Sequence, residues 1–285
     1  MEIHQIGVVG AGTMGAGIAQ TAAAAGYQVL LFDISADAVE RALTQITNRL
    51  AHEVRRDRMT QEASDALLRR LRPCRDIREF HNAQYVIEAA TEKMEVKKSL
   101  FRELDQVCRP ETVLATNTSG LSITEIASAT ERPDLVVGTH FFNPVPVMKL
   151  VEIIRGQETS EDAVDVAREV CLRMGKECID VKEAPLFVVN RILVPMLNEA
   201  IFVLQEGLAS PEDIDKGMRL GANHPIGPLA LADMVGLDTL LFVAETLFEE
   251  TGDPKYRPAP LLRQMVRAGK LGRKNGRGFY TYDEA

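Results

Sequence analysis

Residues 136–154 contain a histidine and a glutamate at a spacing that could support acid–base chemistry. The stretch reads VVGTHFFNPVPVMKLVEII, in which two apolar runs are joined by the sequence NPVP. Two prolines so close together end a helix and do not fit inside a strand ladder, so the centre is predicted to be a turn or loop. If the two runs pair in antiparallel fashion about Pro146, His140 and Glu152 lie opposite each other on one face.

The chemistry expected of such a pair is proton transfer by the imidazole. A carboxylate on one ring nitrogen of His140 fixes the tautomer, leaves the other nitrogen free to take a proton, and stabilises the imidazolium that forms. The alternative is a surface hairpin with an incidental His–Glu pair, because proline-rich loops need not close as tight hairpins. Both interpretations remain open from this stretch alone.

The composition indicates a globular protein with two domains. The chain has 285 residues, a formal net charge of -8, no Trp and few aromatic residues, which argues against a nucleic-acid-binding surface. Its four cysteines (Cys74, Cys108, Cys171 and Cys178) form no CxxC motif, so reduced thiols in a cytoplasmic protein are expected, and no metal site. We expect no signal peptide before the first apolar run at Ile6 and no membrane span.

A glycine motif near the N-terminus predicts a dinucleotide site. Residues 5–33 read as a strand, the sequence GAGTMG, an Ala-rich helix, and a second strand that ends at Asp33. The three glycines allow a tight turn, a close approach of backbone to pyrophosphate, and close packing of helix on strand. Asp33 is expected to accept hydrogen bonds from the ribose, and no arginine follows it to hold a 2′-phosphate, which favours NAD over NADP. The alternative is a glycine-rich turn in another α/β protein. The expected contacts here are Gly10, Gly12, Thr13, Met14, Gly15 and Asp33.

Residues 35–75 have helical periodicity in two segments, which predicts a helical hairpin. The second segment begins near Thr60. The side chains expected to face inward from it are Ala63, Leu67, Leu68 and Leu71. Arginines cluster near the tip at Arg55, Arg56 and Arg58. They are interpreted either as a solvated tip or as a contact for an anionic substrate tail.

Residues 85–181 resume the alternation of strands and helices. Strands are predicted at 85–90, 112–115 and 177–181, with a helix at about 160–174. The polar sequence TNTSG follows the second of these strands, and strand ends in such sheets face the ligand crevice. Alternatively, this segment is a capped turn before the next helix.

From Ala184 onward only helical patterning is found, which places a domain boundary there. Residues 185–206 form an apolar helix interrupted by Pro195, and 228–250 and 261–267 are further helices. A helix that is apolar nearly all round is buried in a core or at a subunit interface. Residues 271–280 form a glycine-rich basic loop.

Six blocks in this order resemble the L-3-hydroxyacyl-CoA dehydrogenase family over nearly the whole chain. They are GVVGAGTMGAGIAQ, NTS, HFFNPVPVMKLVEI, FVVNRI, GANHPIGPLALADMVGLD and GRKNGRGFY. The chain differs from many relatives in having Gly120 after the NTS block, and in carrying arginines and no lysine in residues 49–58.

The resemblance implies a role for individual residues. His140 and Glu152 would transfer the proton, and Ser119 and Asn190 would hold the substrate oxygens. The cofactor contacts that it implies are Asp33, Glu92, Lys97, Asn117, Ser119, Asn143 and Lys274. Arg55 and Arg56 are the corresponding candidates for the CoA tail.

The expected fold is a Rossmann-type α/β domain with a helical hairpin insertion (1–184), followed by an all-α domain for substrate binding and homodimerisation (185–285). The expected reaction is reversible oxidation of an (S)-3-hydroxyacyl-CoA, such as 3-hydroxybutyryl-CoA, with NAD as cofactor and without nucleic-acid or membrane partners. Two alternatives remain: a dehydrogenase of a free sugar acid, similar to L-gulonate 3-dehydrogenase, and a non-catalytic relative similar to a lens crystallin.

Overall fold

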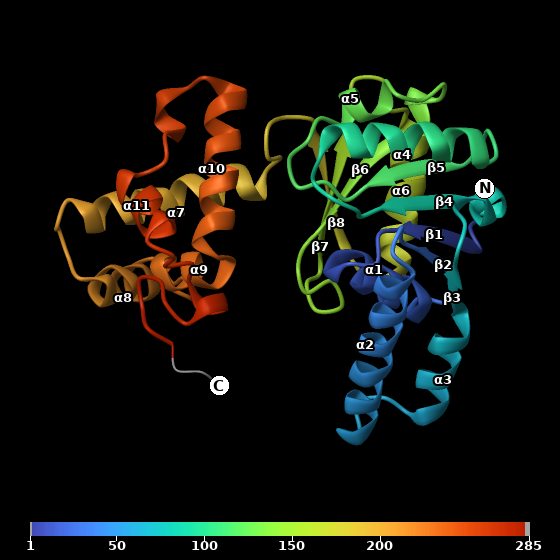
Figure 1. Cartoon of the computed structure of the whole chain (residues 1–285), viewed down its shortest axis with the longest axis horizontal. Coiled ribbons are helices and arrows are strands. Elements are labelled where there is room, and N and C mark those ends of the chain that lie inside the picture. Colours follow the sequence, from blue (N-terminus) through green and yellow to red (C-terminus); the bar gives the residue numbers. More distant parts are fainter. Residues whose placement is uncertain (1, 283–285) are drawn as a thin grey trace. The chain divides into compact units, whose positions relative to one another are not determined.

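The computed structural model describes residues 2–282 and divides into two compact units, one ending at Phe187 and the other beginning at Val188. Figure 1 shows an α/β fold in the first unit and a helical fold in the second. The α/β domain followed by helices that the sequence predicts is therefore confirmed.

The first unit is built on one eight-stranded sheet with the order β3-β2-β1-β4-β5-β6-β7-β8. Strands β1 to β6 are parallel, β7 runs antiparallel to β6, and β8 is parallel to β7. The strands are β1 Gln5–Val9, β2 Gln28–Phe32, β3 Leu71–Cys74, β4 Tyr85–Glu88, β5 Val113–Thr116, β6 Val136–Phe141, β7 Leu150–Arg155 and β8 Glu177–Lys182.

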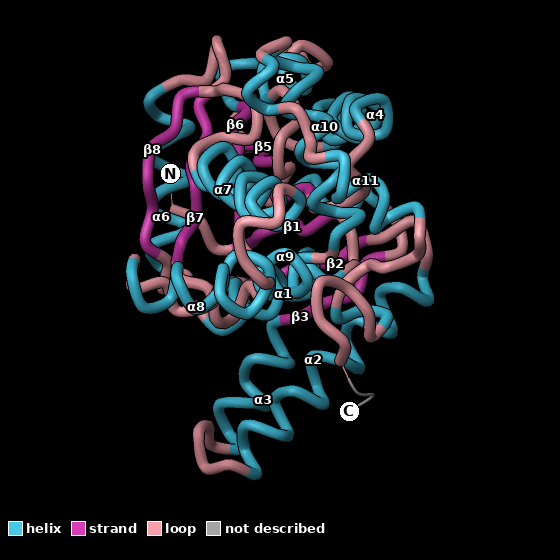
Figure 2. The backbone as a smooth tube through the Cα atoms, turned by 90° about the vertical axis from the view of Figure 1, so that its left-hand side faces the viewer, coloured by secondary structure: helices cyan, strands magenta, loops and turns pink. Residues whose placement is uncertain are grey.

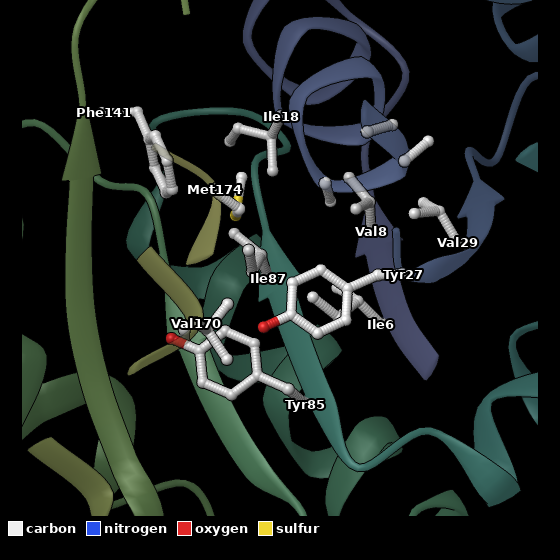
Figure 3. Close-up of a cluster of buried hydrophobic side chains, with 14 of the residues drawn as sticks. Ile6, Val8, Ile18, Tyr27, Val29, Tyr85, Ile87, Phe141, Val170 and Met174 are labelled. Carbon is white, nitrogen blue, oxygen red and sulfur yellow. The ribbon is translucent and has the colours of Figure 1, made fainter. Parts of the chain in front are cut away.

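Helices cover both faces of this sheet, so the central strands are apolar on both sides. Alternate residues of each strand enter one of two cores: Ile6 and Val8 of β1 lie in one, and Val9 lies in the other. Figure 3 shows the first core, where β1, β2 and β4 pack with side chains of α1 (Thr13–Ala24) and of the α6 segment (Glu161–Arg173). The other core includes side chains of α4 (Met94–Val107) and α5 (Ile123–Ala127).

Helices α2 (Ala36–Arg55) and α3 (Gln61–Arg70) form the expected helical hairpin. Both helices begin with a side-chain cap. The Ser35 hydroxyl accepts a hydrogen bond from the Ala38 N–H, and the Thr60 hydroxyl accepts one from the Ala63 N–H. Figures 1 and 2 show the two helices side by side and projecting beyond the sheet.

Two details of this region were predicted wrongly. Leu71 was expected on α3, but it begins β3, a short strand at the edge of the sheet. Ala63 was expected to face inward, but it is exposed, and Ser64 is buried in its place. The helical period begins one residue later than the sequence suggested, because Thr60 is the cap and α3 starts at Gln61.

The second unit contains five helices within the described residues: α7 Val189–Gln205, α8 Pro211–Gly221, α9 Pro228–Val235, α10 Leu237–Thr251 and α11 Pro260–Arg267. Helix α7 continues through Pro195 and supplies Leu197 and Ile201 to a buried core. The single helix expected over 228–250 is wrong. Gly236 has φ +98°, a conformation that breaks a helix, so α9 ends and α10 begins there.

The glycine-rich basic loop of the second unit is anchored by a buried carboxylate. Asp233 is fully buried and accepts from the backbone N–H groups of Phe279 and Tyr280, at 2.9 and 3.0 Å, and from the Tyr282 hydroxyl. These hydrogen bonds tie the C-terminal end of α9 to the loop. Within residues 2–282, no helix is both long enough and apolar enough to cross a membrane.

Candidate active site

The His–Glu pair lies on two adjacent strands in the register that the sequence predicts. His140 of β6 is paired with Glu152 of β7, and Nδ1 of the imidazole is 2.7 Å from Oε2 of the carboxylate. His140 is 4% exposed and Glu152 is fully buried. A carboxylate at Nδ1 requires a proton on that nitrogen, so the other ring nitrogen, Nε2, carries the lone pair.

Two phenylalanine rings flank this imidazole. The ring centroid of Phe142 is 4.5 Å from that of His140, and the centroid of Phe187 is 5.7 Å away. Phe187 and the preceding Leu186 both have φ near +60°, an uncommon conformation for large side chains. These contacts restrict the imidazole to one orientation and limit its exposure to water.

A buried lysine holds the loop between β6 and β7. Lys176 is buried and its ammonium donates to the backbone carbonyls of Val145 and Met148, the latter at 2.8 Å. Burial lowers the pKa of Lys176 from its ordinary value, because water no longer solvates the charged form. Asn143, an expected cofactor contact, lies exposed on this loop, and its peptide bond to Pro144 is cis.

The glycine motif forms the turn from β1 into α1, as the sequence predicts. Gly10 has φ +100°, and a Cβ at Gly15 would lie 1.8 Å from the carbonyl oxygen of Gly10. Gly12 faces open space, which leaves room for a bound pyrophosphate beside the first N–H groups of α1, where Thr13 and Met14 begin the helix. A cavity of about 370 Å³ adjoins this turn; its lining includes Gly10, Gly12, Asp33, Ile34 and Ala90.

Asp33 lies directly after β2, beside the glycine turn. Its carboxylate accepts from the backbone N–H of Ala11 at 2.8 Å and from that of Ser35 at 2.9 Å. Ile34, the next residue, is 98% exposed. The site therefore offers a carboxylate and no cation where a 2′-phosphate would lie, and these residues fit an NAD-type cofactor.

The segment after β5 lies at the same end of the parallel strands as the glycine turn. Asn117 accepts from the backbone N–H of Phe141 at 2.9 Å, which ties this segment to the strand of the histidine. Glu92 accepts from the Thr118 hydroxyl at 2.5 Å and from the Ser119 N–H at 2.6 Å. The capped-turn alternative is also partly met, because Ser122 caps α5.

Gly120, where the chain departs from many relatives, packs against a neighbouring side chain. A Cβ at this position would lie 2.4 Å from a methyl group of Leu186. Leu186 is buried, so the close contact accounts for the absence of a side chain at Gly120.

Lys97, an expected cofactor contact, is buried and pairs with carboxylates of the protein. It is 1% exposed, and its ammonium lies 2.8 Å from each carboxylate oxygen of the fully buried Glu88 and 3.6 Å from Glu92. Its nearest partners are therefore protein carboxylates, and a direct contact with a cofactor stays a prediction.

The remaining expected site residues lie at the hairpin tip and in the second unit. Arg55 and Arg56 are exposed and form no ion pair with any other described residue, whereas Arg58 pairs with Glu53. Asn190 is in the first turn of α7, and Lys274 pairs with Asp238 at the start of α10. Their contacts with substrate or cofactor stay predictions.

Four residues around the site were not foreseen from the sequence: Glu88, Thr118, Lys176 and Phe187. Glu88 had one usable signal, because it is the only charged residue in the apolar strand YVIE. Thr118 lies in the polar segment TNTSG and Phe187 opens the FVVNRI block, but the contacts of these two residues and of Lys176 could not be foreseen, since their partners are 26 to 47 residues away in sequence. Among residues 2–282, no cluster of His, Cys, Asp or Glu could hold a metal ion.

Known proteins match this chain in sequence and in overall structure over nearly its whole length. Residues 5–184 match the family described as 3-hydroxyacyl-CoA dehydrogenase, NAD binding domain, and residues 187–282 match the corresponding C-terminal domain. A probable 3-hydroxybutyryl-CoA dehydrogenase of Bacillus subtilis is 51% identical, and the alignment covers 100% of this chain and 99% of the relative.

Two further relatives match over nearly the whole chain. A 3-hydroxybutyryl-CoA dehydrogenase of Clostridioides difficile is 47% identical over 98% of this chain and 100% of its own length. The crystal structure of (S)-3-hydroxybutyryl-CoA dehydrogenase from Ralstonia eutropha has a TM-score of 0.97 and 49% identity, and it covers 99% of this chain and 100% of that chain. The protein described here belongs to the 3-hydroxyacyl-CoA dehydrogenase family, and its first unit is the NAD-binding domain of that family.

Proposed function

We propose that this protein oxidises (S)-3-hydroxybutyryl-CoA to acetoacetyl-CoA with NAD, and catalyses the reverse reduction with NADH. The observation that carries the proposal is the buried pair of His140 and Glu152, 2.7 Å apart, at the sheet edge that also carries the glycine turn. The names of the full-length relatives in Bacillus subtilis and Clostridioides difficile support the choice of substrate.

In the oxidation, Nε2 of His140 takes the proton of the 3-hydroxyl group. Glu152 accepts from Nδ1 of the same ring and stabilises the imidazolium that results. A bound NAD, held by the glycine turn and Asp33, would supply the acceptor for the hydride that leaves C3 of the substrate. In the reduction, His140 returns the proton to the ketone oxygen. The surrounding phenylalanine rings keep the imidazole oriented and exclude water from its faces.

Ser119 and Asn190 hydrogen-bond the substrate oxygens and polarise the ketone in the reducing direction. Ser119 is the better supported of the two, because Glu92 holds its backbone beside the strand end. Asp33 accepts from the ribose hydroxyls and gives the preference for NAD over NADP.

The CoA tail carries phosphates, so its contact needs cations. Arg55 and Arg56 at the hairpin tip are exposed and lack carboxylate partners in the described part of the chain, so their charges are available to an anionic tail. Phosphate contacts of this kind weaken as salt rises.

The helical unit forms a homodimer. Its support is a set of large apolar side chains exposed on this unit: Ile192, Leu208, Leu220, Met234 and Phe242, each more than half exposed. Contiguous exposed apolar patches mark interaction sites in soluble proteins, and a dimer interface would cover these side chains. The protein acts in the cytoplasm, which agrees with its free cysteines. Light scattering after gel filtration should give twice the chain mass of 31.4 kDa, and a monomer at micromolar concentration would contradict the dimer.

The substrate is tested by following NADH oxidation with a series of 3-ketoacyl-CoAs. We expect turnover of acetoacetyl-CoA, and weaker or equal turnover of longer chains. L-gulonate with NAD is the comparison substrate for a sugar-acid dehydrogenase. Activity with L-gulonate and none with any CoA ester would overturn the proposal, and so would the absence of turnover with every substrate while NADH still binds.

A further inference from the structure

The last two residues of the first unit combine an uncommon backbone conformation with burial. Leu186 has φ +60° and Phe187 has φ +59°, and each residue is 2% exposed. The other non-glycine residues with positive φ within residues 2–282 are Asp57 and Asn223, whose short polar side chains tolerate this region. Leu186 and Phe187 have no such chemistry, so the structure around them must hold the conformation.

Strained backbone of this kind concentrates at functional sites, and here two adjacent side chains contact two parts of the candidate active site. The ring of Phe187 lies beside that of His140, with centroids 5.7 Å apart and an interplanar angle of 57°. Leu186 lies against Gly120, the residue after Ser119, because a Cβ at Gly120 would be 2.4 Å from a Leu186 methyl carbon. The side chain of Leu186 therefore occupies the space that a side chain at Gly120 would fill.

The segment that precedes these two residues is anchored to the same part of the site. Glu183, which directly follows β8, accepts from the Thr124 N–H at 3.1 Å and from the Thr124 hydroxyl. Thr124 is in the first turn of α5, in the chain segment that follows Ser119. Residues 183–187 are thus held against residues 120–124 at both ends, by hydrogen bonds at one end and by the packing of Leu186 at the other.

We propose that Leu186 and Phe187 are positioning residues, which hold two groups of the active site in a fixed relation. Leu186 fills the space beside Gly120 and so supports the Ser119 segment. Phe187 supports one face of the His140 imidazole. Because the two residues are consecutive and their backbone is held at positive φ, a displacement on one side is transmitted to the other. The proposal rests on the function proposed above, since both residues act on groups assigned to that reaction.

The first test moves a side chain from Leu186 to Gly120. Gly120→Ser places a Cβ where Leu186 already lies, so the segment must shift by about 1 Å, and we expect kcat for acetoacetyl-CoA reduction to fall by about 10- to 100-fold. Gly120→Ser/Leu186→Gly removes the clash, and glycine adopts positive φ without strain. We expect this double variant to recover kcat to within about threefold of the wild type.

The single variant Leu186→Gly completes this cycle. It leaves the space beside Gly120 empty and the backbone free, so we expect kcat to fall by about three- to tenfold. Gly120→Ser is then harmful in the wild type and beneficial in Leu186→Gly. This reversal is the signature of a matched pair, because two residues without contact would give additive losses.

The second test concerns the ring beside the imidazole. Phe187→Leu keeps an apolar side chain but removes the aromatic contact, so we expect kcat to fall by about two- to tenfold while KM for NADH stays within about twofold. The matched control is Phe101→Leu, which changes a fully buried ring of α4 in the same core, whereas the rings beside His140 are those of Phe142 and Phe187. The control should lose thermal stability and keep the wild-type kcat.

Hydrogen–deuterium exchange without ligand gives a readout that does not depend on the substrate. Exchange of residues 117–122 should be faster in Gly120→Ser and in Leu186→Gly than in the wild type, and should return to the wild-type rate in the double variant. If the wild type fails to reduce acetoacetyl-CoA, the proposed function fails, and the exchange result still decides the positioning role of Leu186.

Two results would overturn the proposal. One is a double variant that is no more active than Gly120→Ser and exchanges as fast, because Gly120 and Leu186 would then not be matched. The other is a Phe187→Leu variant with the same kcat as Phe101→Leu. If Gly120→Ser alone does not fold, the double variant decides: a folded protein with a kcat above that of Leu186→Gly supports the proposal, and a protein that also fails to fold contradicts it.

Discussion

The substitution Glu152→Gln tests whether the carboxylate acts through the histidine. Glutamine keeps an oxygen that can accept from Nδ1 of His140, so the ring can keep its tautomer and orientation. The negative charge 2.7 Å from the ring is removed. The imidazolium formed during oxidation then lacks its counter-charge, and the oxidation slows.

The size of this loss follows from the geometry. A hydrogen bond to a charged group contributes about 1.5–3 kcal/mol, and each 1.36 kcal/mol corresponds to a tenfold change in rate. The predicted fall in kcat/KM is therefore about 10- to 150-fold. The upper part of this range is favoured, because Glu152 is fully buried and water does not screen the interaction.

The assay is a double-mutant cycle on kcat/KM with (S)-3-hydroxybutyryl-CoA and NAD, the direction in which the imidazolium forms. Residues that act as one unit lose activity non-additively, so Glu152→Gln should cost less than about threefold when added to His140→Gln. Thr139→Val is the matched control: it alters the same strand β6 at the adjacent buried residue, whose side chain points to the opposite face. It should keep activity within about twofold. Multiplicative losses in the cycle would refute the coupling, and thermal unfolding of each variant checks the fold.

Two further predictions concern cofactor choice and pH. Asp33→Ser combined with Ile34→Arg should shift the ratio of kcat/KM for NADH and NADPH toward NADPH by at least about tenfold, because the carboxylate that repels a 2′-phosphate is replaced by a cation at a fully exposed position; a wild type that already prefers NADPH would contradict this. Burial raises the pKa of the Cys108 thiol to about 12 from 9.0, so the stability it contributes is present below pH 9 and is lost as pH rises from 9 toward 12. Between pH 9 and 10.5, urea unfolding under reducing conditions should show the wild type losing more stability per pH unit than Cys108→Ala, by a difference that rises toward about 1.4 kcal/mol per pH unit, and equal slopes would refute the prediction.

The parts of the fold and site that follow from local pattern could be predicted from the sequence. The glycine motif with a strand, a helix and Asp33 is a local signature. The register of His140 and Glu152 follows because side chains alternate along strands and the loop centre at Pro146 fixes the pairing.

The parts that depend on distant contacts could not be predicted. The strand β3 contains Pro73, which normally argues against a strand; it is allowed here because β3 is at the edge of the sheet. The pairing of Lys97 with Glu88 was not predicted, because the two residues belong to different elements and no local pattern relates them. The break at Gly236 was missed because a single glycine is tolerated within a helical pattern.

The most direct test of the proposed mechanism is the activity of His140→Gln in the reduction of acetoacetyl-CoA. NADH affinity is measured for the same protein by fluorescence. We predict that turnover falls by about two to four orders of magnitude, the usual contribution of a positioned acid–base group, while the Kd for NADH stays within about twofold. If the variant keeps more than about a tenth of the wild-type turnover, His140 does not transfer the proton and the proposed mechanism is wrong.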